Sequence, residues 1–159
     1  MADMFIRLIL IAFAILFTAC SRDTAFEYFT RLDSTQERAV TNLKRVTLKE
    51  DNRTVALLSV IYLNPVDPAL YQQQQHFLVA LYDTQKRPLT DYTITLNGKT
   101  PAGIVTLDDN CSLRALMPLN NPWNDYYQLV FSATGDHKLT LQFETGPSLQ
   151  GAVTYDTDR

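Results

Sequence analysis

Hydrophobic and polar residues follow three different patterns along this chain. An unbroken apolar run occupies residues 8–17. Aromatic residues then recur at an interval of three, at Phe26 and Phe29, as they do on one face of a helix. Further along, apolar and polar residues alternate, which is the period of a β-strand. The pattern predicts a helical segment at 24–44 and a β domain at 45–159.

A capping-box pattern divides the helical segment. In the stretch "STQE", the Ser34 side chain is placed to accept a hydrogen bond from the backbone N–H of Glu37. The Glu37 side chain can in turn reach back to the backbone N–H of Ser34. This pattern predicts a second short helix with Val40 and Leu43 on its apolar side, and therefore a kinked helix or a helical hairpin.

Period-two segments separated by Asp, Asn, Gly and Pro predict a series of short strands. They span 45–50, 55–63, 77–82, 92–97, 103–107, 111–117, 126–133, 138–144 and 149–155. Asn97-Gly98 is the strongest tight-turn signal. The stretch around Gly135 predicts a hairpin between the strands at 126–133 and 138–144.

Two of these segments are apolar on both faces. The stretches "VALLSVIYL" (55–63) and "FLVALY" (77–82) leave no polar face for solvent. An antiparallel sheet tolerates such strands where something covers its outer side. We therefore expect them to be neighbours, with the N-terminal helical segment, through Phe26 and Phe29, packed over them.

A short motif favours one class of β fold. Asp125, Tyr127 and Leu129 have the spacing that resembles the tyrosine corner of immunoglobulin-like sandwiches. Together with the series of short strands, this resemblance implies an immunoglobulin-like antiparallel β-sandwich with the helical segment on one sheet. A transthyretin-like sandwich and a small barrel are the alternatives.

The apolar run at 8–17 is too short to span a membrane, which needs roughly 20 apolar residues, but it suits a signal peptide. Its end, "FTAC", resembles the lipobox of bacterial lipoproteins, with Phe17 where the family usually has Leu, Val or Ile. The resemblance implies a signal peptide at 1–19, cleavage before Cys20, acyl chains on that cysteine, and a lipidated tether at 20–23. An ordinary cleaved signal or an uncleaved interfacial helix is the alternative.

The residue after the cysteine bears on location. In such lipoproteins an Asp at this position favours the inner membrane, whereas this chain has Ser21. The resemblance therefore implies the outer membrane with the body facing the periplasm, and the inner membrane and the cell surface stay open. A tether of three residues reaches roughly 10 Å, which would hold the body close to the lipid headgroups.

Charge and composition narrow the classes of partner. The 14 basic and 17 acidic residues give a net charge of −3, so there is no basic excess of the kind that binds nucleic acid. Hydrophobic residues make up 46% of the chain, which suffices for a core without disulfides. With Cys20 acylated, Cys111 would be the remaining thiol. We expect Cys111 to be a small buried residue on the strand at 111–117, with a reactive thiol as the alternative.

Residues suited to catalysis are few. His76 and His137 have no second ligand at a metal-binding interval, and no nucleophile, phosphate-loop or dinucleotide motif occurs. Asp108, Asp109 and Asn110 could supply oxygens to calcium, but the same residues are typical of a tight turn. The sequence thus predicts no enzyme, no cofactor and no metal site.

One loop has the composition of a binding surface. In "PLNNPWNDYY", Trp123, Tyr126 and Tyr127 could form an aromatic platform for a sugar, a peptide or a protein. Alternatively, Trp123 plugs the end of the sandwich. We predict a membrane-anchored periplasmic lipoprotein that acts as a non-catalytic structural or protein-interaction module with an envelope protein partner. The alternative is a lipoprotein that binds a small ligand, lipid or glycan, through the Trp123 loop.

Overall fold

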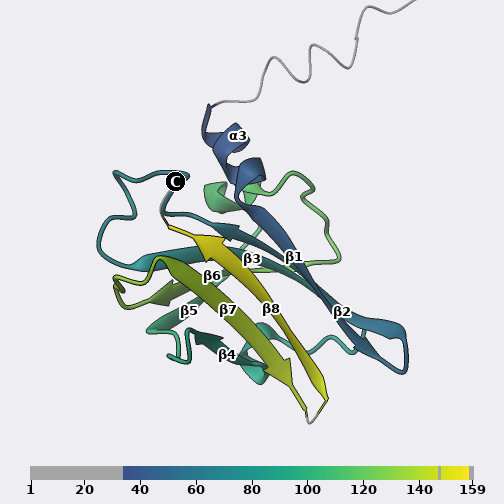
Figure 1. The fold of residues 1–159 in the computed structure, drawn as a ribbon. Coiled ribbons are helices and arrows are strands. Elements are labelled where there is room, and N and C mark those ends of the chain that lie inside the picture. The colour runs from purple at the N-terminus through teal and green to yellow at the C-terminus, as the bar shows by residue number, and fades with distance from the viewer. Residues whose placement is uncertain (1–33, 147, 158–159) are drawn as a thin grey trace, which may run out of the picture. The chain divides into compact units, whose positions relative to one another are not determined.

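The computed structural model describes residues 34–146 and 148–157, which form a mainly β structure (Figure 1). The helix α3 (Ser34–Thr41) precedes the first strand, and two 3-10 helices, η1 (Leu89–Asp91) and η2 (Ser112–Leu116), lie in loops. The strands of the described chain are β1 (Leu43–Glu50), β2 (Arg53–Tyr62), β3 (Gln75–Asp83), β4 (Thr93–Leu96), β5 (Gly103–Leu107), β6 (Asp125–Phe131), β7 (Lys138–Thr145) and β8 (Leu149–Asp156).

The strands form two antiparallel sheets in a sandwich-like arrangement. The larger sheet has the order β1-β2-β3-β6-β5, and the smaller sheet has the order β4-β7-β8. The facing sides of the sheets bury one apolar cluster, to which Leu58, Phe77 and Phe143 belong. The predicted mainly β fold with two packed antiparallel sheets and a short helix before them is confirmed.

The two strands that are apolar on both faces lie side by side, as expected. β2 pairs with β3, with Val60 opposite Val79 on the inner face and Ile61 opposite Leu78 on the outer face. A second apolar cluster covers this outer face, and it draws on α3, η2 and the segment between β2 and β3. Its buried members are Ala39, Ile61, Leu63, Val66, Tyr71, Leu78, Ala80, Met117 and Tyr126. The predicted covering residues Phe26 and Phe29 lie outside the described residues.

The short helix begins at the predicted capping box but buries a different residue. Ala39 is fully buried in the second cluster, whereas Val40 is exposed. Leu43 already belongs to β1 and packs against the same cluster from there. The prediction of Val40 as the buried residue was wrong because α3 contacts the sheet and η2 with the small side chain of Ala39.

Two tight turns reverse the chain, one between the paired strands β1 and β2 and one after β4, where Leu96 forms an isolated bridge with Lys99. Asp51 and Asn52, between β1 and β2, and Asn97 and Gly98, after β4, all have positive φ angles. Paired positive φ angles are typical of two-residue hairpin turns, which explains the Asn-Gly sequence. The Asn97 side chain extends the ladder, because its amide nitrogen donates to the Lys138 carbonyl at 2.9 Å and its oxygen accepts the Thr140 N–H at 2.8 Å.

The predicted strand at 111–117 was wrong. This segment forms η2, in which Leu113 and Leu116 pack on the outer face of the larger sheet, with Arg114 and Met117 buried beside them. Burial therefore recurs every three residues and not every two, as in a 3-10 helix. Cys111 lies just before η2 as a half-buried free thiol and not on a strand face.

The predicted hairpin around Gly135 was also wrong. β6 pairs with β3 and β5, whereas β7 pairs with β4 and β8, so the segment between β6 and β7 crosses from one sheet to the other. The alternation of apolar and polar residues identifies both strands, but it carries no information about which sheet a strand joins.

The two long sides of the sandwich differ. On one side, β1 of the larger sheet runs beside β8 of the smaller sheet (Figure 1). A Cβ atom on Gly151 of β8 would lie 2.3 Å from Cγ1 of Val46, so the missing side chain allows this contact. On the other side, β5 and β4 are the edges of their sheets. We call these the closed side and the open side.

Candidate functional site

The three aromatic residues of the predicted platform do not share a surface. Trp123 is 67% exposed on the loop before β6, whereas Tyr126 and Tyr127 are buried. Because neighbouring residues of a strand point to opposite faces, Tyr126 joins the outer cluster and Tyr127 joins the cluster between the sheets. The alternative in which Trp123 plugs the sandwich does not hold either, because its side chain faces solvent.

The two tyrosines hold loops in place. The Tyr126 hydroxyl accepts the N–H of Asn121 at 2.8 Å and thereby fixes the loop that carries Trp123. The Tyr127 hydroxyl accepts the N–H of Leu89 at 3.3 Å, 38 residues earlier in the chain. In a tyrosine corner the backbone partner is only a few residues upstream. Burial raises the pKa of Tyr127, so its hydroxyl stays neutral.

A buried arginine packs behind the loop. Arg114 of η2 is only 7% exposed, and its guanidinium lies 4.1 Å from the ring centroid of Tyr126. Its Nη1 forms an ion pair with Asp109 and its Nη2 donates to Oδ1 of Asn120 at 3.2 Å. Its buried Nε has no hydrogen-bond partner among the described residues. This nitrogen is withdrawn from solvent, so the arginine is held in place through its two terminal nitrogens.

These residues line a groove of about 420 Å³. The groove lies between the end of β5, the Asp109–Arg114 ion pair and the loop before β6. Its lining residues are Thr106, Leu107, Asp109, Arg114, Asn120, Pro122, Asn124, Asp125 and Tyr126. Trp123 stands between two of them, Pro122 and Asn124. The volume falls within the roughly 300–1,000 Å³ typical of small-molecule sites.

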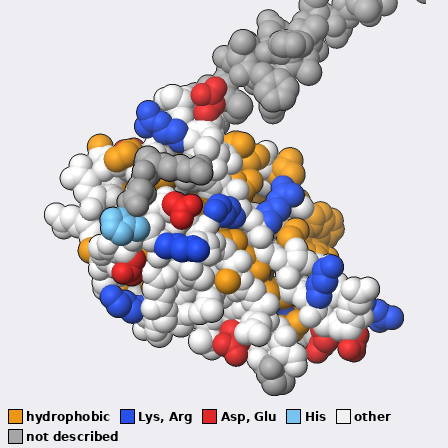
Figure 2. Space-filling view, viewed as in Figure 1, with side chains coloured by type: hydrophobic (Ala, Val, Ile, Leu, Met, Phe, Trp, Pro, Cys, Tyr) orange, Lys and Arg blue, Asp and Glu red, His pale blue; other side chains and the backbone are white. Residues whose placement is uncertain are grey.

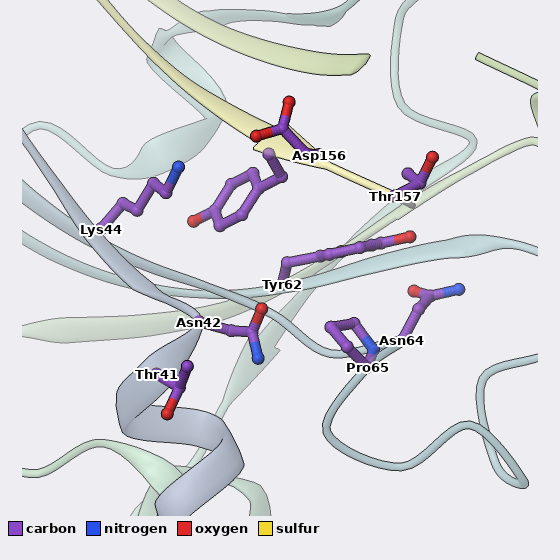
Figure 3. A pocket seen from close by; sticks show the side chains of 9 residues that line it. Thr41, Asn42, Lys44, Tyr62, Asn64, Pro65, Asp156 and Thr157 are labelled. Atoms are coloured by element: carbon purple, nitrogen blue, oxygen red, sulfur yellow. The ribbon is translucent and has the colours of Figure 1, made fainter. Parts of the chain in front are cut away.

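A second hollow, of about 450 Å³, lies at the start of β1 beside the end of β8 (Figure 3). Lys44 and Asn42 line it from the side of β1, Tyr62 from β2, and Tyr155 and Asp156 from β8. Much of its polar lining is engaged within the protein. The Lys44 ammonium donates to the Thr154 carbonyl, Asn42 caps α3 through the Arg38 carbonyl, and Tyr62 donates to Gln75 at 2.6 Å.

A buried polar cluster, which sequence reasoning missed, joins the sheets at one end. Asp83, at the end of β3, accepts hydrogen bonds from the Tyr92 hydroxyl, from the Gln85 N–H at 2.6 Å and from Arg87 Nε at 2.9 Å. Burial alone would raise the pKa of Asp83, but these bonds and the charge of Arg87 hold it below its usual range. Burial and the neighbouring carboxylate raise the pKa of Tyr92. Both protonation states are therefore fixed at neutral pH, which suits a structural role.

The histidines lie apart from this cluster. The ring of His76 is 4.8 Å from that of Tyr71, its Nδ1 lies 3.3 Å from Gln128 Nε2, and desolvation lowers its pKa. His137 is exposed between β6 and β7. Within residues 34–146 and 148–157, no group of three or more His, Cys, Asp or Glu side chains is placed to hold a metal ion. Asp109 of the possible calcium ligands is instead the partner of Arg114.

The predicted lipidation site Cys20 lies outside the described residues. In the part of the chain that the structure describes, no helix combines the length and the apolar character that crossing a membrane requires.

Arg114 is the residue of the groove that the sequence did not reveal. Read as a strand, "CSLRALM" places Arg114 on the polar face, opposite the residues expected in the core. The spacing of Leu113, Leu116 and Met117 was the available signal for a 3-10 turn. Even so, it would not have shown that the arginine lies on Tyr126.

Comparisons of this chain with protein-family models, with curated proteins and with solved structures find no match.

Proposed function

We propose that this chain is a lipid-anchored, periplasm-facing lipoprotein of the bacterial outer membrane that acts as a non-catalytic interaction module of the cell envelope. The anchor is supported by the sequence Phe17-Thr18-Ala19-Cys20, with its preceding apolar run. Two or more acyl chains hold a protein stably at a bilayer, whereas one chain holds it only marginally. The partner is an envelope protein that supplies an extended segment.

The observation that carries the docking proposal is the contrast between the edges of the larger sheet. Unpaired strand edges recruit other strands, and soluble proteins usually protect them with charge, especially Lys. β1 carries Lys44, Arg45 and Lys49, and basic side chains follow its course in Figure 2. β5 carries no charged residue, and Val105 at its centre is 51% exposed. An uncharged edge with free backbone groups suits addition of a partner strand.

Other edges of the sandwich are less suited to this role. β8 is flanked by β1 on the closed side. β4 has four residues, and a very short edge strand is itself a protective device. β5, with five residues, therefore offers the best docking edge among the described strands.

A pair of matched variants tests the docking edge. Val105 and Thr47 both lie at exposed positions on the outer face of the larger sheet, one on β5 and one on β1. We expect Val105→Lys to abolish recovery of a stoichiometric partner from solubilised membranes, with Thr47→Lys unaffected. Both variants should keep the free energy of unfolding within about 0.5 kcal/mol of the wild type. A photo-crosslinker at position 105 should label the same partner, whereas one at position 47 should not.

Equal partner recovery by both lysine variants would contradict docking at β5. A shift of the protein from dimer to monomer in Val105→Lys would identify the occupant as a second copy of this chain and would contradict an envelope partner.

The anchor has its own test. Mass spectrometry of the mature protein should show a chain that begins at Cys20 and carries acyl chains. Cys20→Ser should move the protein from the membrane to the soluble fraction. An unmodified Cys20 in wild-type protein that is soluble would contradict the lipoprotein proposal but would leave the docking edge unaffected.

We also propose that the sandwich is immunoglobulin-like. If β1 is set aside, the remaining strands have the orders β2-β3-β6-β5 and β4-β7-β8. These orders correspond to A-B-E-D and C-F-G of the seven-stranded immunoglobulin domain, which supports the proposal. β1 would then be an additional strand at the edge. An experimental structure with a different pairing would contradict it.

A second candidate function is the binding of a small ligand at the Trp123 loop. The specific observation in its favour is that Trp123 is exposed in a loop whose residues Pro122 and Asn124 line a groove. Aromatic residues beside a few convergent polar groups are typical of ligand sites. Loss of ligand binding in Trp123→Ala would support this function.

A further inference from the structure

The exposed apolar side chains of the described residues lie on one side of the sandwich. They belong to the outer face of the larger sheet, or to α3, the segment between β2 and β3 and the segment after η2, which contribute to the cover of that face. These large exposed hydrophobic residues are Val40, Leu70, Tyr82, Val105, Leu119 and Trp123. Single exposed hydrophobic residues are normal, whereas their gathering on one side indicates a surface that contacts a partner or a membrane.

The outer face of the smaller sheet has the opposite character. Its outward positions are polar apart from one alanine, and no large hydrophobic residue of the described strands β4, β7 and β8 is exposed. These outward positions are Thr93, Thr95, Thr140, Gln142, Glu144, Gln150, Ala152 and Thr154. The described body is therefore amphipathic, and amphipathic structures lie at a boundary between water and lipid with their apolar side toward the lipid.

The segment 117–124, between η2 and β6, presents the apolar side most clearly. It contains no charged residue, and Leu119 is 72% exposed and Trp123 67% exposed. Hydrogen bonds hold its backbone, because the Trp123 N–H donates to Oδ1 of Asn121 at 3.0 Å and the Asn121 N–H donates to the Tyr126 hydroxyl at 2.8 Å. The fold thus fixes this segment with two large apolar side chains outside the core.

The place of this segment in the fold favours a lipid surface over a protein. α3 is the first described element after the proposed anchor, and it packs on η2, from which the segment continues. Only residues 21–33 separate Cys20 from Ser34, so an acylated Cys20 would hold α3 within roughly 50 Å of the bilayer even with the chain fully extended. In Figure 2, hydrophobic side chains gather beside α3, where this segment runs in Figure 1. Tryptophan is itself enriched at the boundary between lipid and water.

We propose that the side of the sandwich formed by α3, η2 and the segment 117–124 lies on the bilayer, with Leu119 and Trp123 inserted at the level of the lipid headgroups. This inference rests on the lipid anchor of the proposed function and adds a second membrane contact, which orients the body. The polar face of the smaller sheet then points into the periplasm. The β5 edge opens along the membrane, where an envelope partner can reach it.

The chain carries its own reporter, because Trp123 is its single tryptophan. The full-length protein, purified from cells, is reconstituted into phosphatidylcholine vesicles. Phosphatidylcholine with brominated acyl chains should quench most of the Trp123 emission, whereas iodide in the water should quench little of it. Adding anionic phosphatidylglycerol should leave the quenching by lipid unchanged, because the inserted segment is uncharged.

A reporter on the opposite face is the matched control. Trp123→Phe combined with Gln142→Trp moves the tryptophan to an exposed position on the outer face of β7. Iodide should quench this tryptophan, and brominated lipid should not.

A pair of single charges tests the insertion itself. Leu119→Glu should lower the quenching of Trp123 by brominated lipid by about twofold or more, because a carboxylate resists transfer into the bilayer. Gln150→Glu places the same charge on the smaller sheet and should leave the quenching unchanged. Both positions are exposed, and circular dichroism should show both variants folded.

The outcomes separate this inference from the anchor on which it rests. If Cys20 is acylated but iodide and not brominated lipid quenches Trp123, the anchor stands and the membrane contact is overturned. If Cys20 is unmodified and brominated lipid still quenches Trp123, the contact stands and the anchor fails. Equal quenching of both tryptophan positions by lipid would overturn the orientation. Shielding of Trp123 from iodide in native membranes, without quenching by brominated lipid in vesicles, would assign this side to a protein partner and overturn the inference.

Discussion

The closed side and the open side of this sandwich differ in how the two sheets are held together and in how their edge strands are protected. On the closed side, the edge strands β1 and β8 lie against each other, with Gly151 of β8 on Val46 and Leu48 of β1. The Tyr155 hydroxyl of β8 donates to the Val60 carbonyl of β2 at 2.8 Å. Contact between the sheets is therefore distributed along the strands.

On the open side, β5 and β4 lie at the free edges of their sheets. The chain crosses between the sheets through the segment after β3, where Asp83 joins Tyr92 and Arg87, and Arg87 Nη1 approaches Thr145 of β7 at 3.5 Å. The sheets are thus linked at one end by buried polar groups. An edge with no partner strand stays accessible, which is why we place docking at β5.

The difference shows how one fold can leave a single edge open. Lys44, Arg45 and Lys49 protect β1 by charge, and Lys44 also bonds across to the Thr154 carbonyl of β8. β5 has neither protection. Charge and packing protect the β1 edge of the larger sheet. The β5 edge is therefore the accessible one.

The largest effect is expected at the polar link. Asp83→Asn removes a buried carboxylate and leaves Arg87 without its charge partner, which should lower the free energy of unfolding by about 3 kcal/mol. Chemical denaturation measures this change. Asp91→Asn, at an exposed position on η1, is the control and should leave the denaturation midpoint unchanged. A small effect of Asp83→Asn would show that the closed side alone holds the sheets together.

Acid should act through the same residue. The pKa of Asp83 is lower in the folded protein than its ordinary value, so the stability it contributes is present above about pH 4 and is lost as the pH falls through the lowered pKa. The stability difference between wild type and Asp83→Asn should therefore be constant near neutrality and shrink below about pH 4. A difference that stays constant at pH 2 to 3 would contradict this assignment.

An intermediate effect is expected where β8 meets β1. Gly151→Ala would place a methyl group 2.3 Å from Val46 and 2.8 Å from Leu48, and overpacking of this kind should cost about 2 kcal/mol. Gly103→Ala on β5 is the matched control, because a Cβ atom there meets nothing within 4 Å. Thermal unfolding should separate the two variants. Equal melting temperatures would mean that the closed side accommodates a side chain and is not tightly packed.

The smallest effect is expected for the hydrogen bond across the closed side. Tyr155→Phe removes the bond to the Val60 carbonyl but keeps the aromatic packing on Tyr62 and Phe77, so it should cost about 1 kcal/mol. Denaturation at neutral pH is the measurement. Burial raises the pKa of Tyr155, so the hydroxyl stays protonated and this loss should not vary between pH 6 and about pH 9. A loss that disappears toward pH 9 would indicate that the hydroxyl ionises.

The sequence located most strands because each has one solvent-exposed and one buried face or is apolar on both faces. The double-sided apolar character of β2 and β3 also predicted a cover over the outer face, and the second cluster is that cover. The prediction of a strand at 111–117 failed because a few apolar residues at short intervals fit the period of a strand as well as that of a 3-10 helix. The prediction of a hairpin between β6 and β7 failed because turn residues predict a change of chain direction but not which sheet the next strand joins.

For the candidate site, the sequence identified the loop but not its geometry. An exposed aromatic residue could be anticipated from the Pro- and Asn-rich context of Trp123. The separation of Tyr126 from Tyr127 follows from strand alternation, yet it required knowing that both faces of β6 are buried. The stacking of Arg114 on Tyr126 joins residues of a 3-10 helix and a strand, and short-range pattern does not encode such contacts.

By itself, the sequence determined the mainly β character, the tight turn at Asn97-Gly98, the uncharged composition of β5 and the lipobox-like segment before the body, because local periodicity and side-chain chemistry suffice for these. Only the tertiary structure decided which strands share a sheet, which edge β8 meets, and which cation lies behind the Trp123 loop. These depend on contacts between residues far apart in the chain. Their energies come from burial and shape, which a linear pattern of apolar and polar residues does not specify.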